Sequence, residues 1–127
     1  MWGTRILTHE APFTDARDPA TLDTPMKKAL IVMTDGSNTI GPVGVYHSTS
    51  ASGIANSNTL KACDEAKNNG IEVYTISFGS GVPTSVKNLL RACASDSANY
   101  YHAGNGGLDD VFSMIAGQLR DSVRLTQ

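Results

Sequence analysis

The sequence predicts an α/β fold, in which a short Rossmann-like parallel sheet is flanked by helices. Three segments with strand character, 27–34, 71–78 and 99–103, alternate with segments whose apolar residues have helical spacing. Such alternation is typical of βαβ units, whose strands run parallel. The length of 127 residues suits one small domain with its own core.

The first strand is expected at residues 27–34, which read K-K-A-L-I-V-M-T. A continuous apolar run between a charged pair and an Asp-Gly turn favours a strand that is buried on both faces. Residues 1–26 should form an irregular N-terminal segment, the end of a helix followed by a loop rich in Pro and Asp. No charged residue occurs from Gly36 to Leu60, and we expect a long loop over residues 36–58.

A helix should follow at residues 58–69, capped by Asn56 or Ser57, and a β-branched and aromatic strand at residues 71–78. Thr84 can cap a second helix, and a third should run from about Leu108 to Leu125. The expected apolar stripes are Leu60, Cys63 and Ala66; Val86, Leu89, Leu90 and Cys93; and Leu108, Val111, Phe112, Ile115, Leu119 and Val123.

The two cysteines, Cys63 and Cys93, lie in the first two of these helices. Right-handed crossovers that step in one direction place successive helices on the same face of the sheet. The two helices should therefore be neighbours. An even pair of cysteines permits one disulfide, but two buried thiols fit the pattern as well.

Charge and hydropathy exclude two kinds of partner for this segment. Ten Lys and Arg against 12 Asp and Glu give a net charge of −2, which is no basic footprint for nucleic acid. The longest aliphatic run, residues 29–33, is far shorter than the ~20 residues that span a bilayer. We therefore expect neither nucleic-acid binding nor a membrane segment in this chain.

The strongest chemical signal is T-D-G-S-N-T at residues 34–39. Asp35 follows a buried strand, and open α/β sheets bind ligands at the carboxyl ends of their strands. Ser37 and Thr39 add oxygen atoms of the kind that Mg²⁺ prefers. The alternative is that Asp35 caps a turn, which the neighbouring polar side chains only solvate.

Several segments together resemble the von Willebrand factor A (vWA) domain, and more narrowly the domain of TadG-like proteins in bacterial tight-adherence (Flp) pilus assembly. The resemblance covers nearly the whole chain, and the T-D-G strand end alone is only moderately specific. The matching segments are K-K-A-L-I-V-M-T-D-G-S-N-T, L-K-A-C-D-E-A-K-N-N-G-I-E-V-Y-T-I-S-F-G, L-L-R-A-C-A-S and N-Y-Y-H-A.

The resemblance implies an incomplete vWA domain, in which residues 27–127 hold the last three strands and their helices. The family's metal-ion-dependent adhesion site (MIDAS) uses three loops, and only the Asp of the third loop matches here, at Asp35. Ser37 and Thr39 would then make water-mediated contacts at most. Mg²⁺ or Mn²⁺ should bind weakly, and the open edge of the first strand should invite self-association.

The function implied is a non-enzymatic interaction or adhesion module of pilus assembly at the periplasmic or extracellular face of the cell envelope. Its partner would be a protein, and full-length relatives are expected to be membrane-anchored. This setting favours a disulfide between Cys63 and Cys93. Two alternatives stay open: an enzyme that uses Asp35 for phosphoryl transfer or hydrolysis, and a structural module with a vestigial metal site.

Overall fold

A computed structural model describes residues 2–11, 14–18, 21–22, 26–38 and 52–124 of the chain. Three strands, β1 (Lys28–Thr34), β2 (Ile71–Phe78) and β3 (Tyr100–Ala103), form a parallel sheet in the order β1-β2-β3. The register pairs Lys28 with Ile71 at one end of β1 and Thr34 with Ser77 at the other. The predicted α/β fold with a short parallel sheet is confirmed.

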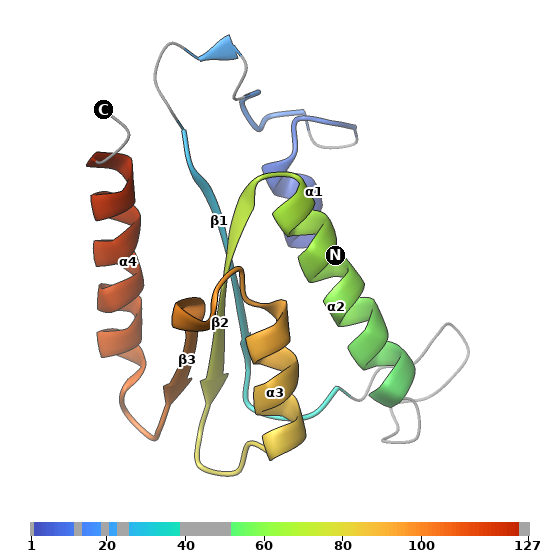
Figure 1. The fold of residues 1–127 in the computed structure, drawn as a ribbon, viewed down its shortest axis with the longest axis vertical. Helices are drawn as coiled ribbons and strands as arrows, with labels where there is room; N and C mark the ends of the chain where they lie inside the picture. The colour runs from blue at the N-terminus through green and yellow to red at the C-terminus, as the bar shows by residue number, and fades with distance from the viewer. Residues whose placement is uncertain (1, 12–13, 19–20, 23–25, 39–51, 125–127) are drawn as a thin grey trace.

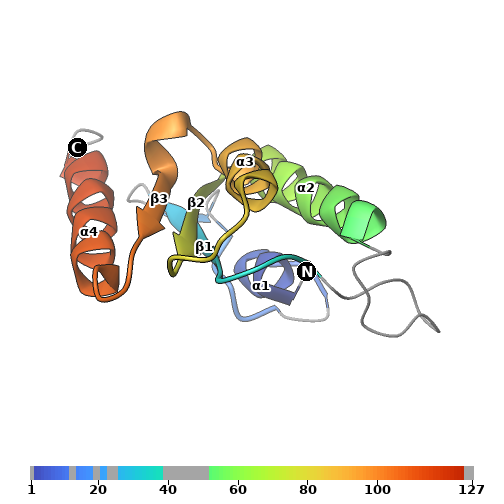
Figure 2. The same ribbon diagram turned by 90° about the horizontal axis from the view of Figure 1, so that it is seen from below.

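Helices cover both faces of this sheet (Figure 1). The chain runs in the order α1 (Trp2–Leu7), β1, α2 (Ser52–Asn68), β2, α3 (Thr84–Cys93), a 3₁₀ turn η3 (Ser97–Asn99), β3 and α4 (Leu108–Arg124). Figure 2 shows α2 and α3 on one side of the strands and α4 on the other. The adjacency predicted for the helices that carry the cysteines is thus correct.

The core consists of apolar clusters on the two faces of the central strand β2. On one face Val73 packs with residues of α2 and α3, and on the other Tyr74 and Ile76 pack with Val111 and Ile115 of α4. Successive side chains of a strand point to opposite faces, so β2 contributes to both layers. Its polar members on the α3 side are paired: the buried Thr75 donates a hydrogen bond to the Leu90 carbonyl at 2.9 Å.

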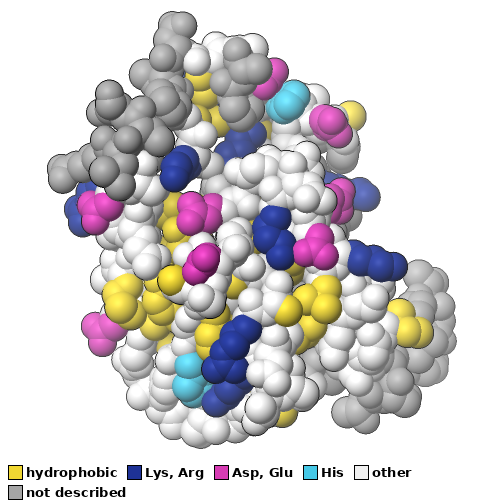
Figure 3. Space-filling model, in the orientation of Figure 1, with side chains coloured by type: hydrophobic (Ala, Val, Ile, Leu, Met, Phe, Trp, Pro, Cys, Tyr) yellow, Lys and Arg dark blue, Asp and Glu magenta, His cyan; other side chains and the backbone are white. Residues whose placement is uncertain are grey.

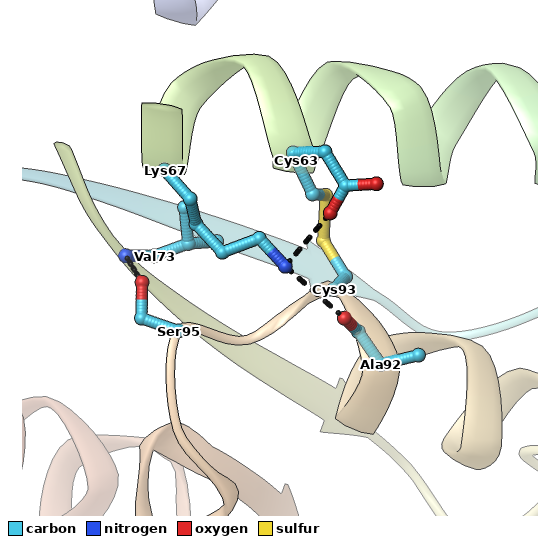
Figure 4. Close-up of polar contacts among 7 residues, drawn as sticks. Cys63, Lys67, Val73, Ala92, Cys93 and Ser95 are labelled. Carbon is cyan, nitrogen blue, oxygen red and sulfur yellow. Dashed lines mark hydrogen bonds and ion pairs between the residues drawn. A yellow bond between two sulfur atoms is a disulfide. The ribbon is translucent and has the colours of Figure 1, made fainter. Parts of the chain in front are cut away.

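A disulfide joins α2 to α3 through Cys63 and Cys93, whose Cα atoms lie 5.3 Å apart (Figure 4). Both cysteines are fully buried. Beside the bridge, Lys67 forms an ion pair with Asp64 at 2.9 Å and donates a hydrogen bond to the Ala92 carbonyl. The predicted disulfide is confirmed, and the alternative of two free thiols is wrong for this structure.

Ser95, just after α3, continues the hydrogen bonding of β2 before β3 begins. Its hydroxyl accepts from the Val73 N–H at 2.8 Å, and its own N–H donates to the Val73 carbonyl at 2.9 Å (Figure 4). Since β3 pairs with β2 only from Thr75 onward, Val73 would otherwise lack backbone partners on that side. Ser95 therefore serves as a one-residue substitute for a strand.

Element boundaries differ from the sequence predictions in three places. Helix α2 begins at Ser52, not Asn58, so the expected caps Asn56 and Ser57 lie inside it. The first two turns of α2 are rich in Ser and Asn, which have low helix propensity, but the tertiary contacts described below stabilise them as a helix. Pro83, rather than Thr84, occupies the N-cap of α3. Asn99 belongs to η3. Of the expected loop 36–58, residues 39–51 lie outside the described residues, and residues 52–58 belong to α2.

The prediction that β1 is buried on both faces is wrong. Leu30 and Val32 pack against the α2 layer, whereas Ile31 and Met33 on the other face are 39% and 49% exposed. Helix α4 packs against β2 and β3, and of the described residues of β1 only Ala29 packs against the apolar cluster that they form. Phe112, which was predicted in the buried apolar stripe of α4, is also 40% exposed. The side chain of Val123 lies outside the described residues.

The disulfide should contribute strongly to stability because it closes a loop of 30 residues. In the chain-entropy account such a loop stabilises the folded state by about 3–4 kcal/mol. We expect the double variant Cys63→Ala/Cys93→Ala to lose that amount of unfolding free energy in urea denaturation. Dithiothreitol should destabilise the wild type similarly and leave the double variant unchanged. An unfolding midpoint equal in all four samples would contradict the prediction.

Tyr74 should make stability fall at high pH. Burial, reinforced by the nearby Glu72 carboxylate, raises the pKa of the Tyr74 hydroxyl to about 12. Below pH 10 the hydroxyl is protonated in both states; above it, only the unfolded chain loses the proton readily, which favours unfolding. Between pH 10 and 12 the wild type should lose roughly 2–3 kcal/mol relative to Tyr74→Phe. Parallel pH profiles of the two proteins, measured by urea denaturation, would refute this.

Candidate functional site

Asp35 lies on a tight turn at the carboxyl end of β1. The Thr34 hydroxyl donates to the Gly36 carbonyl at 2.9 Å and accepts from the Gly36 N–H at 3.3 Å. These two bonds close the turn around Asp35, whose side chain is exposed, as is that of Ser37. Thr39, the third predicted site residue, lies outside the described residues. The turn thus presents the Asp35 carboxylate to solvent.

Asn38 connects this turn to helix α2. Its side-chain amide donates to Asn56 Oδ1 at 2.8 Å and to Thr59 Oγ1 at 3.2 Å, and Thr59 in turn donates to the Ala55 carbonyl. Sequence reasoning missed this contact because it placed Asn56 at a helix cap. No local pattern links residues 18 and 21 positions apart. The contact joins the turn after β1 to the first half of α2.

A hollow of about 180 Å³ lies beside the turn, between β1 and α3. Residues 32–34 of β1, Asn38 and Thr59 form one part of its wall, and Val86, Leu89 and Leu90 of α3 form the other. Its lining is therefore partly apolar and partly amide and hydroxyl. Asp35 is not among the lining residues, so the carboxylate stands at the same end of the sheet but outside the hollow.

The described residues supply only part of a metal centre. Among them, no group of three or more His, Cys, Asp or Glu side chains is close enough to hold a metal ion. Hard cations such as Mg²⁺ need several oxygen ligands in near-octahedral arrangement. Asp35 offers one carboxylate, and the Thr34 hydroxyl is engaged with Gly36. A tightly bound ion would need ligands from beyond this part of the chain.

A second polar network, not predicted from the sequence, joins the carboxyl end of β2 to β3 and α3. The Ser77 hydroxyl lies 2.9 Å from the Tyr100 hydroxyl and 2.8 Å from His102 Nδ1, and Lys87 Nζ lies 3.5 Å from His102 Nε2. A hydroxyl beside an imidazole can act as a nucleophile. Ser77, however, is 0% exposed. The network therefore holds β3 against β2 and offers no accessible nucleophile.

The face of the molecule drawn in Figure 3 has no large area of a single charge. On the face drawn in Figure 3, Lys and Arg side chains are interspersed with Asp and Glu. This agrees with the net charge of −2 and with the absence of a basic footprint. Of the helices described here, none has the length and apolar character needed to cross a membrane.

Comparisons with known proteins place the chain in no family. No family model matches it, and no curated protein does. Similar solved structures include proximal thread matrix protein 1 (PTMP1) from the mussel byssus, in crystal form 2, at 17% identity and a TM-score of 0.41. Another, of the same protein with a zinc-occupied MIDAS motif, has 15% identity and a TM-score of 0.43.

These alignments cover 78% and 96% of this chain but only 19% and 22% of the mussel chains. The chain thus spans about a fifth of their length. Similarity at this level carries no argument about site or function. The α/β class rests instead on the strand order and register of the chain itself.

The Asn38 contact gives a stability prediction for this end of the sheet. Asn38→Ala removes two hydrogen bonds and leaves Asn56 and Thr59 without that donor, which should lower the unfolding free energy by about 1–2 kcal/mol. The control is Ser37→Ala at the neighbouring exposed position, where we expect a change within about 0.5 kcal/mol. Urea denaturation measures both; equal effects of the two substitutions would argue against a role for the contact.

Proposed function

We propose that this chain is a vWA-type protein-interaction module whose partner binds at the carboxyl end of β1. One observation carries the proposal: a turn closed by Thr34 and Gly36 presents the Asp35 carboxylate to solvent at the carboxyl end of a parallel strand. Open α/β sheets bind their ligands at that end. The neighbouring hollow, with amide, hydroxyl and apolar walls, supplies a surface on which a partner side chain can pack.

The topology supports the vWA assignment. In this family the T-D-G loop follows the fourth strand, and the described order β1-β2-β3 with T-D-G after β1 is what the last three strands of such a sheet would give. The sequence segments that resemble the family coincide with β1, with the second half of α2 together with β2, with the end of α3, and with β3. The resemblance and the topology are therefore consistent over the same elements.

A divalent ion, Mg²⁺ or Mn²⁺, would strengthen this contact. Asp35 would hold it directly, Ser37 and Thr39 are the candidates for water-mediated contacts, and an acidic side chain of the partner would complete the ligand set. Because the described residues bring no cluster of three His, Cys, Asp or Glu side chains together at this turn, we expect weak affinity for the ion alone. A bound ion would supply positive charge that attracts the partner's carboxylate.

The setting that we propose is bacterial tight-adherence pilus assembly at the periplasmic or extracellular face of the envelope. The buried disulfide supports an oxidising compartment, since such bonds persist there and are rare in the cytosol. The proposed role is non-enzymatic. The Ser77 hydroxyl beside His102 is buried, so this pair offers no accessible nucleophile.

The test measures binding to tight-adherence pilus-assembly proteins by biolayer interferometry. We expect binding in Mg²⁺ that falls at least about tenfold in EDTA and in Asp35→Asn, because the ligand carboxylate is lost. The control Asp121→Asn removes the same charge from an exposed position on α4 and should bind normally.

Calorimetry with Mg²⁺ or Mn²⁺ and this chain alone should show weak binding. A micromolar site would contradict the view that the ligand set is partial. If the partner still bound in EDTA and to the Asp35→Asn variant, neither a metal ion nor the Asp35 carboxylate would be part of the binding site. Retention of beryllofluoride with Mg²⁺, in place of partner binding, would favour phosphoryl-transfer chemistry at Asp35.

A further inference from the structure

Three basic side chains lie together where α3 packs against β3. Lys87 and Arg91 are four residues apart on α3, and such residues share one face of a helix. Lys87 Nζ lies 3.5 Å from Nε2 of His102 on β3, and the Arg91 guanidinium lies over the Tyr100 ring, 4.6 Å from its centroid. Figure 3 shows a histidine and basic side chains side by side over this part of the molecule.

A buried hydroxyl fixes the two rings of this cluster. The Ser77 hydroxyl lies 2.8 Å from His102 Nδ1 and 2.9 Å from the Tyr100 hydroxyl, and Ser77 is itself fully buried. Because an ammonium group can only donate hydrogen bonds, His102 Nε2 accepts from Lys87 and Nδ1 carries the ring proton. The rings are therefore held from the core, and the two cations lie on their outer side.

The charges of Lys87 and Arg91 are not neutralised within the described part of the chain. Neither side chain forms an ion pair there. Asp96, five residues beyond Arg91, instead accepts hydrogen bonds from the Ala98 N–H and the Ser97 hydroxyl. The helix dipole favours a cation in the last turn of α3, which accounts for Arg91 but not for Lys87. Like charges four residues apart oppose each other, so a bound anion would relieve their repulsion.

We propose that the side chains of Lys87, Arg91 and His102, the α3–β3 basic cluster, bind an acidic segment of a protein partner. The Arg91 guanidinium can take one carboxylate through two parallel hydrogen bonds. Lys87, whose contact with a neutral ring nitrogen is long, can turn its ammonium group to a second carboxylate. This inference does not rest on the proposed function, whose contacts lie at the end of β1.

The spacing of the cations suits acidic residues at alternate positions of an extended segment. Side chains four residues apart on a helix begin about 5–6 Å from each other. Alternate residues of an extended chain lie on the same side about 7 Å apart. Two carboxylates at that spacing can each meet one cation of the α3–β3 basic cluster.

The size of the cluster favours a short acidic segment over a nucleic acid. Nucleic-acid sites gather basic residues in a long patch or stripe, whereas this cluster has three basic side chains on a chain of net charge −2. Exposed ion pairs are individually weak and are screened by salt. We therefore expect low affinity that decreases strongly as the salt concentration rises.

Titration of the ¹⁵N-labelled chain with a capped hexaglutamate peptide, in EDTA and low salt, tests the proposal by NMR. EDTA removes any contribution of a metal ion at Asp35, so the result is independent of the proposed function. We expect saturable shift changes centred on residues 84–93 and 100–103, with a dissociation constant on the order of 10⁻⁴ M. About 0.5 M NaCl should raise that constant at least about fivefold. The absence of saturable changes, or changes centred elsewhere, would overturn the proposal.

A pair of charge-matched variants tests which cations are used. Lys87→Gln/Arg91→Gln removes both cations of the cluster and should weaken binding at least about tenfold. The control Lys61→Gln/Arg120→Gln removes the same charge from exposed positions on α2 and α4 and should stay within about twofold of the wild type. Equal losses in the two variants would show that only net charge matters, which contradicts a defined site.

Two further measurements complete the test. Thermal unfolding shows whether each variant folds. If the double variant does not, Lys87→Gln carries the test, because it leaves the Ser77 and Tyr100 contacts in place, and it should weaken binding about threefold. A short oligothymidylate that binds more tightly than hexaglutamate at the same salt concentration, and loses binding in the same variant, would replace the acidic segment by a nucleic acid and overturn the proposal.

Discussion

The burial of β2 on both faces is the constraint on which the rest of the structure depends. Six of its eight residues are buried. Because side chains alternate along a strand, these residues belong to two separate packing layers. Val73 belongs to the layer of α2 and α3, and Tyr74 and Ile76 to the layer of α4. At roughly 1.5–3 kcal/mol for each large apolar side chain removed from water, this strand alone links the stability of both layers. Two of its buried residues are polar, and both form hydrogen bonds: Thr75 with Leu90, and Ser77 with Tyr100 and His102.

The two sides of β2 are completed in different ways. On the side of β3, side chains and a loop residue supplement the short ladder of backbone hydrogen bonds. Ser95 bonds both the N–H and the carbonyl of Val73, and the Ser77 hydroxyl bonds to His102 of β3. The disulfide then holds α2 and α3 over that layer. On the other side, β2 and β1 share a longer ladder of backbone hydrogen bonds, and among the described residues β1 pairs with no other strand. Both outer strands of the sheet, β1 and β3, therefore pair with β2 alone among the described residues.

Sequence reasoning succeeded where one local pattern determined the outcome. The strand at residues 71–78 is rich in β-branched and aromatic residues, and the crossover rule predicts that Cys63 and Cys93 lie in neighbouring helices. It failed where long-range contacts decided. The first turns of α2 have loop-like composition, and the helix extends through them because Asn56 and Thr59 bind Asn38 across the chain. The burial of β1 was overestimated because its apolar run says nothing about how far α4 reaches. The Asp35 turn was located correctly, but whether ligands gather around it depends on parts of the fold that a strand-end motif does not contain.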